Sequence, residues 1–316
     1  MDNIKVSPER FVGMQAGNAE LQSRLLDLIR GGLVELDLAP PSDRIGMSHQ
    51  YFEEFAARMV DAQLGSIGKR IRTWASFRET FPDTWHEKLL DELGTLFIFS
   101  KAFQKFDTLS ESLQDELLAQ AGVSTRTNDL FQQQGIQDDW LVLGQVTTPE
   151  PNNLTSRRTW LMGKETQKIV LSLEYTFGAA EFTTLWLKGM VYMGEAVYYP
   201  AAYPLRVGFK SVDLAPSFTE VVGYQTIEPF LADYSEAIAQ NPWLPQFPVL
   251  LTSVTAVFSE NKFLLVDAEK KYVHTAGGQV SSWALLALSG GYPISVFGEW
   301  DGHVLKTLNA FSVKRA

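Results

Sequence analysis

The chain has 316 residues, of which 45% are hydrophobic and 20% charged, a composition typical of a folded globular protein. It contains no cysteine, which excludes disulfides, thiolate nucleophiles and every zinc site built on Cys ligands. The net charge of −10 argues against a nucleic-acid-binding face, and the longest apolar run, Trp283 to Leu288, is far shorter than the roughly 20 residues that span a bilayer.

Apolar residues recur at helical spacing through the first part of the chain and predict a helical bundle up to residue 136. Asn18 is expected to cap the first helix, which Gly31-Gly32 ends. Residues 33–47 contain Pro40-Pro41 and are expected to form a connection. Further helices are predicted to begin at Ser48, after Pro82-Asp83 and at Ser110, the last ending at Gly122, with a short one over residues 128–134.

The pattern changes after Gly135 to short apolar or alternating runs, which predict a β-rich region from 137 to 316. One helix is expected inside it, at about 226–239, while 281–288 fits a helical turn or a strand equally well. Residues 147–156 hold two Pro and two Asn and read as a loop. Strands are predicted at 140–143, 159–162, 168–177, 190–199, 205–209, 249–258, 263–266, 292–300 and 303–308. The expected fold class is therefore α+β, with a helical domain at 1–136 and a β-rich domain at 137–316.

Familiar catalytic motifs are absent from the sequence: it has no phosphate loop, no Gly-x-Ser-x-Gly elbow, no His-Glu-x-x-His helix and no Gly-x-Gly-x-x-Gly turn. We therefore expect no cofactor and no metal, and a non-enzymatic role is favoured. An enzyme remains an alternative if the fold assembles a carboxylate and histidine site in the β-rich region. Such a site would draw on Asp267, Glu269, His274, Glu299 and His303.

Two arginines and a tryptophan open a predicted strand at Arg157-Arg158-Thr159-Trp160. Guanidinium groups on opposite faces of a strand can clamp carboxylates of a partner or stack on rings. They can equally fix the preceding loop to a neighbouring strand. We take Arg157, Arg158 and Trp160, together with Trp300 beside the Asp301-Gly302 hairpin turn, as candidate interaction residues.

The main basic cluster consists of Lys69, Arg70, Arg72 and Arg78, and the first three are its candidate binding residues. It could bind phosphate or nucleic acid. A solvated helix end is the favoured interpretation, because cations suit the negative end of a helix and acidic residues flank the cluster. Nucleic acid is therefore an unfavoured partner.

Several segments, in this order and spacing, resemble the C-terminal region of bacterial SWIM zinc-finger family proteins. The resemblance runs from about residue 20 to the end of the chain. The segments that carry it are residues 56–63 (AARMVDAQ), 140–145 (WLVLGQ), 157–161 (RRTWL), 199–206 (YPAAYPLR), 288–293 (LSGGYP) and 297–302 (FGEWDG).

The resemblance has one clear departure. The family's defining Cys-x-Cys … Cys-x-His zinc site lies upstream of this region, and a chain without cysteine cannot form it. Either the finger has been lost or the chain is the downstream part of a longer protein. The family's finger implies DNA or protein binding, and its genes often lie beside those of MoxR-type ATPases and von Willebrand A-domain proteins.

Together, these observations predict a protein-interaction or accessory module whose partner could be a MoxR-type ATPase or a von Willebrand A-domain protein. Met1 to Glu20 holds no apolar stretch of signal-peptide length, so the cytoplasm is the expected location.

Overall fold

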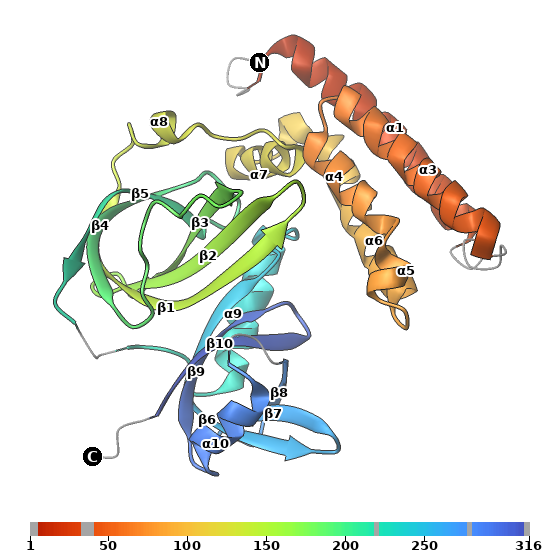
Figure 1. Cartoon of the computed structure of the whole chain (residues 1–316). Coiled ribbons are helices and arrows are strands. Elements are labelled where there is room, and N and C mark those ends of the chain that lie inside the picture. The colour runs from red at the N-terminus through yellow and green to blue at the C-terminus, as the bar shows by residue number, and fades with distance from the viewer. Residues whose placement is uncertain (1–5, 33–40, 218–220, 277–279, 313–316) are drawn as a thin grey trace. The chain divides into compact units, whose positions relative to one another are not determined.

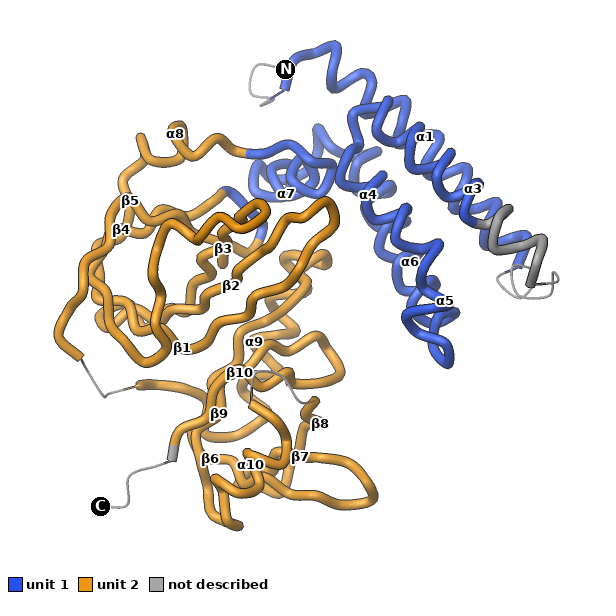
Figure 2. Tube along the Cα trace, viewed as in Figure 1, with its two compact units in different colours: residues 1–124, 200–202 blue, residues 125–199, 203–316 orange. Residues whose placement is uncertain are grey.

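The computed structural model describes residues 6–32, 41–217, 221–276 and 280–312, with the side chains of 41–48 and 312 left aside (Figure 1). The chain divides into two compact units (Figure 2). The helical unit comprises residues 1–124 and 200–202, and the β-rich unit comprises 125–199 and 203–316. The predicted α+β class, with helices first and strands after, is confirmed.

The helical unit is held together by apolar residues at helical spacing, such as Met14, Leu25, Phe55 and Leu93, all fully buried. Its last helix begins beside Ser110, as predicted, and Ser110 caps it by accepting a hydrogen bond from the backbone of Leu113. The elements are α1 (Pro8–Gly31), α3 (Pro41–Asp61), α4 (Gly65–Trp74), α5 (Phe77–Thr80), α6 (Trp85–Phe103), the 3-10 turn η1 (Phe106–Thr108) and α7 (Glu111–Ala121).

Two predicted helix starts were wrong. Helix α1 begins at Pro8 with Ser7 as its cap, and Asn18 lies buried within it, donating from its side chain to the Ser100 carbonyl. Helix α3 begins at Pro41, not at Ser48, because proline is well suited to a first helical position that needs no N–H partner. The rest of the expected connection, residues 33–40, lies outside the described residues.

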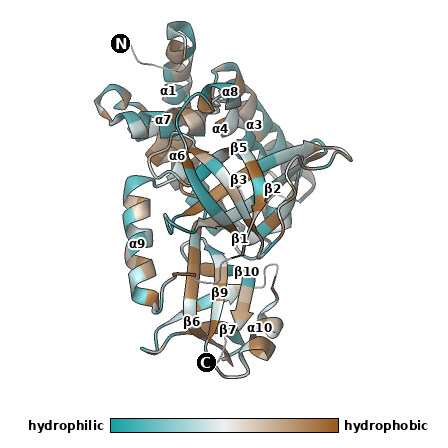
Figure 3. Ribbon diagram, turned by 90° about the vertical axis from the view of Figure 1, so that its left-hand side faces the viewer, coloured by the Kyte–Doolittle hydropathy of each residue, from teal (hydrophilic) through white to brown (hydrophobic). Residues whose placement is uncertain are grey.

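The β-rich unit contains two closed five-stranded barrels, preceded by the short helix α8 (Thr127–Leu130). Their strands carry both hydrophobic and hydrophilic residues (Figure 3). The first barrel has the order β1-β2-β3-β5-β4 and the second β10-β8-β7-β6-β9. The strands are β1 (Ile136–Glu150), β2 (Leu154–Gly163), β3 (Ile169–Phe177), β4 (Val191–Tyr198), β5 (Arg206–Ala215), β6 (Phe247–Ser259), β7 (Lys262–Val266), β8 (Tyr272–Ala276), β9 (Ile294–Trp300) and β10 (Val304–Ser312).

Both barrels share one topology. Numbered within each barrel, the strands run 1-2-3-5-4, and the third and fifth strands pair in parallel while the other pairs are antiparallel. This is the strand order of the OB-fold barrel. Helix α9 (Ile227–Gln240) joins the barrels, and α10 (Ser282–Ser289) lies between the third and fourth strands of the second. The chain is therefore a helical bundle followed by two barrels of one design.

The predicted loop at 147–156 was wrong, because β1 and β2 continue their antiparallel pairing as far as Glu150 and Leu154, leaving a tight turn at 151–153. Asn152 and Asn153 adopt the left-handed conformation that this turn requires. Strand β8 was missed, and residues 281–288, left open between helix and strand, form α10.

The two barrels share a core. Trp160 and Leu143 of the first barrel cluster with Phe297 and Leu308 of the second. Gly144 lets strands of the two barrels approach closely, because a Cβ at this position would lie 2.9 Å from Phe297 and from Leu308. The side-chain amide of Asn309 also donates to the Leu143 carbonyl, so the barrels form one packed body.

Candidate functional site

A pocket of about 940 Å³ lies between the two barrels and α9, and we call it the tyrosine pocket. Its first wall is formed by the turn before β3, by the last residue of β4 and by the end of the β4–β5 connection. Its second wall comes from the segment before α9, from α9 itself and from the start of β6. The polar side chains that line it are Gln167, Lys168, Tyr198, Tyr203, Tyr224, Asp233 and Gln240, and the apolar side chains include Ile136, Leu205, Phe247 and Leu250.

Tyr224 and Asp233 form the best-defined polar contact of the pocket. The backbone of Tyr224 donates to Leu250 and accepts from Thr252, each at 2.8 Å, which fixes this segment against β6. Its phenol then donates to a carboxylate oxygen of Asp233, one turn and a half into α9, at 2.7 Å. Asp233 is exposed, and among the described residues only Tyr224 donates a hydrogen bond to it. Its other carboxylate oxygen is therefore free to meet a ligand.

The phenols of the pocket stay protonated at neutral pH. Burial raises the pKa of Tyr198. Burial, and then the charges of Asp233 and Glu236, raise the pKa of Tyr203. Burial raises the pKa of Tyr224 far more, helped by its hydrogen bond to Asp233. The pocket thus offers neutral phenols as hydrogen-bonding groups and as aromatic faces.

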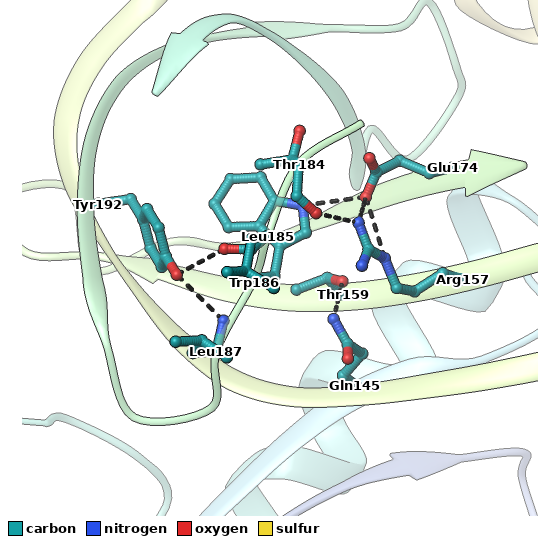
Figure 4. A network of polar contacts seen from close by, with 9 residues as sticks. All are labelled: Gln145, Arg157, Thr159, Glu174, Thr184, Leu185, Trp186, Leu187 and Tyr192. Carbon is teal, nitrogen blue, oxygen red and sulfur yellow. Dashed lines mark hydrogen bonds and ion pairs between the residues drawn. The ribbon is translucent and has the colours of Figure 1, made fainter. Parts of the chain in front are cut away.

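The predicted interaction residue Arg157 lies inside the protein, as Figure 4 shows. Its guanidinium contacts Glu174 on β3 at 2.6 Å, donates to the Thr184 carbonyl and stacks over the ring of Phe182 at 4.1 Å. The indole of Trp186 donates to the same carboxylate at 3.0 Å. Arg157 therefore ties the β3–β4 connection to the barrel.

Arg158 and Trp160 also point inward. Arg158 makes a bidentate pair with Glu299 on β9, with distances of 2.9 and 3.1 Å, and the Trp160 indole donates to Glu299 at 2.8 Å. Trp160 and Glu299 are 1% and 2% exposed, so this contact is closed to a partner.

Trp300, the fourth candidate, lies in the core of the second barrel. Its ring meets Phe230 edge-on at 5.5 Å and Tyr234 at 6.4 Å, both on α9. Within the described part of the chain, its buried indole N–H has no hydrogen-bond partner. Its role in the structure is to seat α9 on the barrel.

The basic cluster is largely neutralised within its own unit. Arg70 makes two hydrogen bonds to Glu92, at 2.9 and 3.0 Å, and Arg72 contacts Glu53 at 2.8 Å. Lys69 is exposed. Among the described residues Lys69 forms no ion pair, and a single lysine is a weak electrostatic basis for binding a phosphate backbone.

None of the five residues considered for an assembled catalytic site lines the tyrosine pocket. Buried Asp267 accepts backbone hydrogen bonds from Ile227, Glu269 and Lys271 and so caps the start of α9 and the β7–β8 turn. Glu299 is occupied by Arg158. His303 and Glu269 are exposed. No group of three or more His, Cys, Asp or Glu able to hold a metal occurs among the residues that the structure describes.

The tyrosine pocket was missed at the level of sequence. Tyr198 and Tyr203 flank the β4–β5 connection, while Tyr224 and Asp233 belong to the link between the barrels. Nothing in the spacing of these residues indicates that they converge. The one available signal is the density of Tyr and Pro in residues 198–204, which is unusual for a simple turn.

A second feature lies on the outer surface of the second barrel. Val273 and Leu305 point into the barrel, so Tyr272, His274 and Lys306 beside them point outward. Tyr272 is 57% exposed, its ring meets His274 edge-on at 5.8 Å, and Lys306 is exposed. We call these three residues the β8–β10 face.

Residues 9–121 match the family model of the SWIM-associated four-helix bundle domain. The helical unit is similar to that domain. The resemblance expected from the sequence is therefore confirmed for these residues, and the absence of cysteine is consistent with the lack of the zinc finger. The match ends at residue 121, before β1 begins. No curated protein and no solved structure matches the chain.

Over the described ranges, none of the helices is both long enough and apolar enough to span a bilayer.

Proposed function

We propose that the protein is a non-enzymatic interaction module and that the tyrosine pocket receives a segment of a protein partner. The observation that carries this proposal is a large, mostly apolar pocket on one packed body, with neutral phenols and one exposed carboxylate as its recognition groups. Pockets of this kind, with an apolar lining and a few placed polar groups, are typical binding sites.

The ionisable groups of the pocket favour recognition over catalysis. Asp233 is exposed and already accepts a hydrogen bond from Tyr224, and the raised pKa of that phenol makes it a poor source of a nucleophilic oxygen. The alternative of an enzyme built on Asp267, Glu269, His274, Glu299 and His303 has less support, since the pocket includes none of them.

The partner class follows from the resemblance to SWIM zinc-finger family proteins. A MoxR-type ATPase or a von Willebrand A-domain protein in the cytoplasm is the proposed partner. The SWIM-associated bundle at residues 9–121 supports an accessory role of this kind.

The test is a capture from native lysate with three forms of the intact chain as bait. Val222 is 60% exposed and lines the pocket, so Val222→Trp places a bulky side chain at the pocket wall without disturbing the core. Leu214→Trp is the matched control, because Leu214 is 67% exposed and lies outside the pocket. We expect an ATPase or von Willebrand A-domain protein with the wild type and with Leu214→Trp, and its loss with Val222→Trp. Equal recovery of the partner with both variants would show that it binds outside the tyrosine pocket.

A second candidate function is the binding of single-stranded nucleic acid by the β8–β10 face. It is favoured by the exposed aromatic ring of Tyr272 and the exposed cation of Lys306, which lies opposite Ala276 further along the same outward face, since single strands bind to stacking rings accompanied by positive charge. Titration of a labelled oligonucleotide at rising salt tests it: Tyr272→Ala and Lys306→Gln should each weaken binding, and Lys69→Gln should not. No binding at low salt would remove this candidate.

A further inference from the structure

The helix side of the tyrosine pocket is acidic. Helix α9 runs from Ile227 to Gln240 and contains no lysine, arginine or histidine; its acidic residues are Glu228, which pairs with Lys271, and Asp233 and Glu236. Asp233 lines the pocket, and Asp233 and Glu236 both act on the phenol of Tyr203. The last residue of the helix, Gln240, also lines the pocket, and the C-terminal end of a helix attracts cations.

Aromatic rings line the pocket together with Asp233. Tyr203 lies 6.2 Å from Phe247 between ring centroids, and both rings line the pocket together with Tyr224. Faces of neutral aromatic rings attract organic cations, most strongly where the site excludes water. The phenol of Tyr224 is held in place by its hydrogen bond to Asp233, so this part of the pocket is organised before any ligand binds.

We propose that the tyrosine pocket binds the cationic side chain of a lysine or arginine that the protein partner presents. The charged end meets the free carboxylate oxygen of Asp233, and the alkyl stem lies along the rings of Tyr203, Tyr224 and Phe247. This inference rests on the proposed function, because it names the chemistry by which the same pocket recognises its partner.

Lys168 is the one basic side chain in the pocket lining, and it opposes this assignment. It is exposed and comes from the turn before β3, on the wall opposite α9. An anionic ligand would depend on Lys168, whereas a cationic ligand would be repelled by it. The effect of removing the charge of Lys168 on binding therefore shows whether the ligand is anionic or cationic.

The test uses small probes and the full chain labelled with 3-fluorotyrosine, observed by fluorine NMR at constant ionic strength. The probes are n-butylammonium, which matches a lysine side chain, and butyrate, its anionic counterpart. Tyr203→Phe and Tyr224→Phe assign the two reporter signals. A Gly-Ser peptide with one central lysine then separates a polypeptide source from a free amine, since the peptide binds more tightly only if flanking backbone also contacts the pocket.

We expect n-butylammonium to shift both signals, and Asp233→Asn to weaken its binding about fivefold, the upper range for an exposed charge pair. Lys168→Gln should leave binding unchanged or tighten it about twofold. Asp213→Asn, on β5 and outside the pocket, is the matched control and should have no effect. Binding of butyrate that Lys168→Gln abolishes would overturn the proposal, as would unchanged binding in Asp233→Asn or no response to n-butylammonium.

The two proposals fail in different ways. A partner captured by the wild type and lost with Val222→Trp, together with no response to n-butylammonium, would keep the partner site and reject the cationic ligand. A response to n-butylammonium lost in Asp233→Asn, with no partner dependent on Val222, would keep the cation site and reject the proposed function.

Discussion

Arg158 on the first barrel and Glu299 on the second form a bidentate ion pair, with nitrogen–oxygen distances of 2.9 and 3.1 Å. Glu299 is 2% exposed and also accepts a hydrogen bond from the Trp160 indole. Arg158 and Glu299 are 141 residues apart in sequence, so these side chains link the two barrels. The interface therefore holds a buried charge whose partners all belong to the other barrel.

Removing the partner of this buried charge should destabilise the β-rich unit strongly. We expect Arg158→Met to lower the free energy of unfolding by about 3–5 kcal/mol, because Glu299 is left buried with one of its three hydrogen bonds. Urea unfolding followed by tryptophan fluorescence measures this loss.

The double variant Arg158→Met with Glu299→Leu should recover much of that stability, since no charge is then buried. Arg72→Met is the control for an exposed pair and should cost no more than about 1 kcal/mol. A loss below about 1 kcal/mol in Arg158→Met would mean that water reaches Glu299 and that the barrels are less closely packed than described.

Asp138 should make stability depend on acid pH. Burial pushes its pKa up, but hydrogen bonds from the backbone of Glu165, from the backbone and hydroxyl of Thr166 and from the backbone of Asp139 together hold that pKa below its ordinary value. The unfolded carboxyl then binds its proton more readily than the folded one. The stabilisation is therefore complete above the unfolded pKa of about 3.9 and is lost as pH falls through the lowered folded value.

We expect Asp138→Asn to cost about 2–3 kcal/mol at pH 7, because the amide cannot accept all four hydrogen bonds. The difference from the wild type should shrink below about pH 4, as the wild-type carboxyl takes up its proton. Urea midpoints from pH 7 to pH 3 measure it. Asp213→Asn, at an exposed position, should lie within about 0.5 kcal/mol of the wild type throughout. A difference that stays constant with pH would show that the charge of Asp138 is not what stabilises the turn.

The elements that sequence predicted well are those with local signals. Ser110 and Gly122 mark the ends of α7 because a cap and a left-handed glycine act within one turn of the helix. The β9–β10 hairpin follows from its Asp301-Gly302 turn. The α+β order follows from the change of apolar period near Gly135.

The features that could not be predicted from the sequence depend on contacts between distant segments. The parallel pairing of β3 with β5 and of β8 with β10 closes each barrel, and periodicity carries no information on it. Arg158 was singled out as a possible clamp for carboxylates, but its carboxylate, Glu299, lies on another barrel. The tyrosine pocket exists only once both barrels have closed, so its residues had no shared signal.

Arg157 should control the order of the β3–β4 connection. Its guanidinium holds Glu174, the Thr184 carbonyl and the ring of Phe182, while Trp186 donates to the same Glu174. We expect Arg157→Met to raise amide hydrogen exchange of residues 179–190 by about tenfold or more, because roughly 1.5–3 kcal/mol of charged hydrogen bonding is lost there.

Mass spectrometry of exchanged peptides measures this effect. Arg157→Lys should give an intermediate result, since one ammonium group can pair with Glu174 but cannot also stack on Phe182 and reach Thr184. An equal rise in exchange across the whole β-rich unit would show that Arg157 supports the barrel and not this connection in particular.

Two glycines of the helical unit should respond in opposite directions to alanine. A Cβ at Gly68 on α4 would lie 2.7 Å from the carbonyl oxygen of Ala56 and 2.9 Å from a methyl group of Val60, both on α3. A Cβ at Gly94, within α6, would meet nothing within 4 Å. We expect Gly68→Ala to lower the free energy of unfolding by about 1–3 kcal/mol, because the contact between α3 and α4 must widen.

Gly94→Ala should instead raise the free energy of unfolding by about 0.5–1 kcal/mol, because alanine loses less backbone entropy than glycine when a helix forms. Urea unfolding followed by circular dichroism at a helix wavelength compares the two variants directly. Helix propensity alone predicts a gain at both positions, so the sign at Gly68 reports on the packing of α3 against α4. A gain at Gly68 would mean that α3 and α4 leave room for an extra methyl group, and the helical unit would then be packed less tightly than its buried core implies.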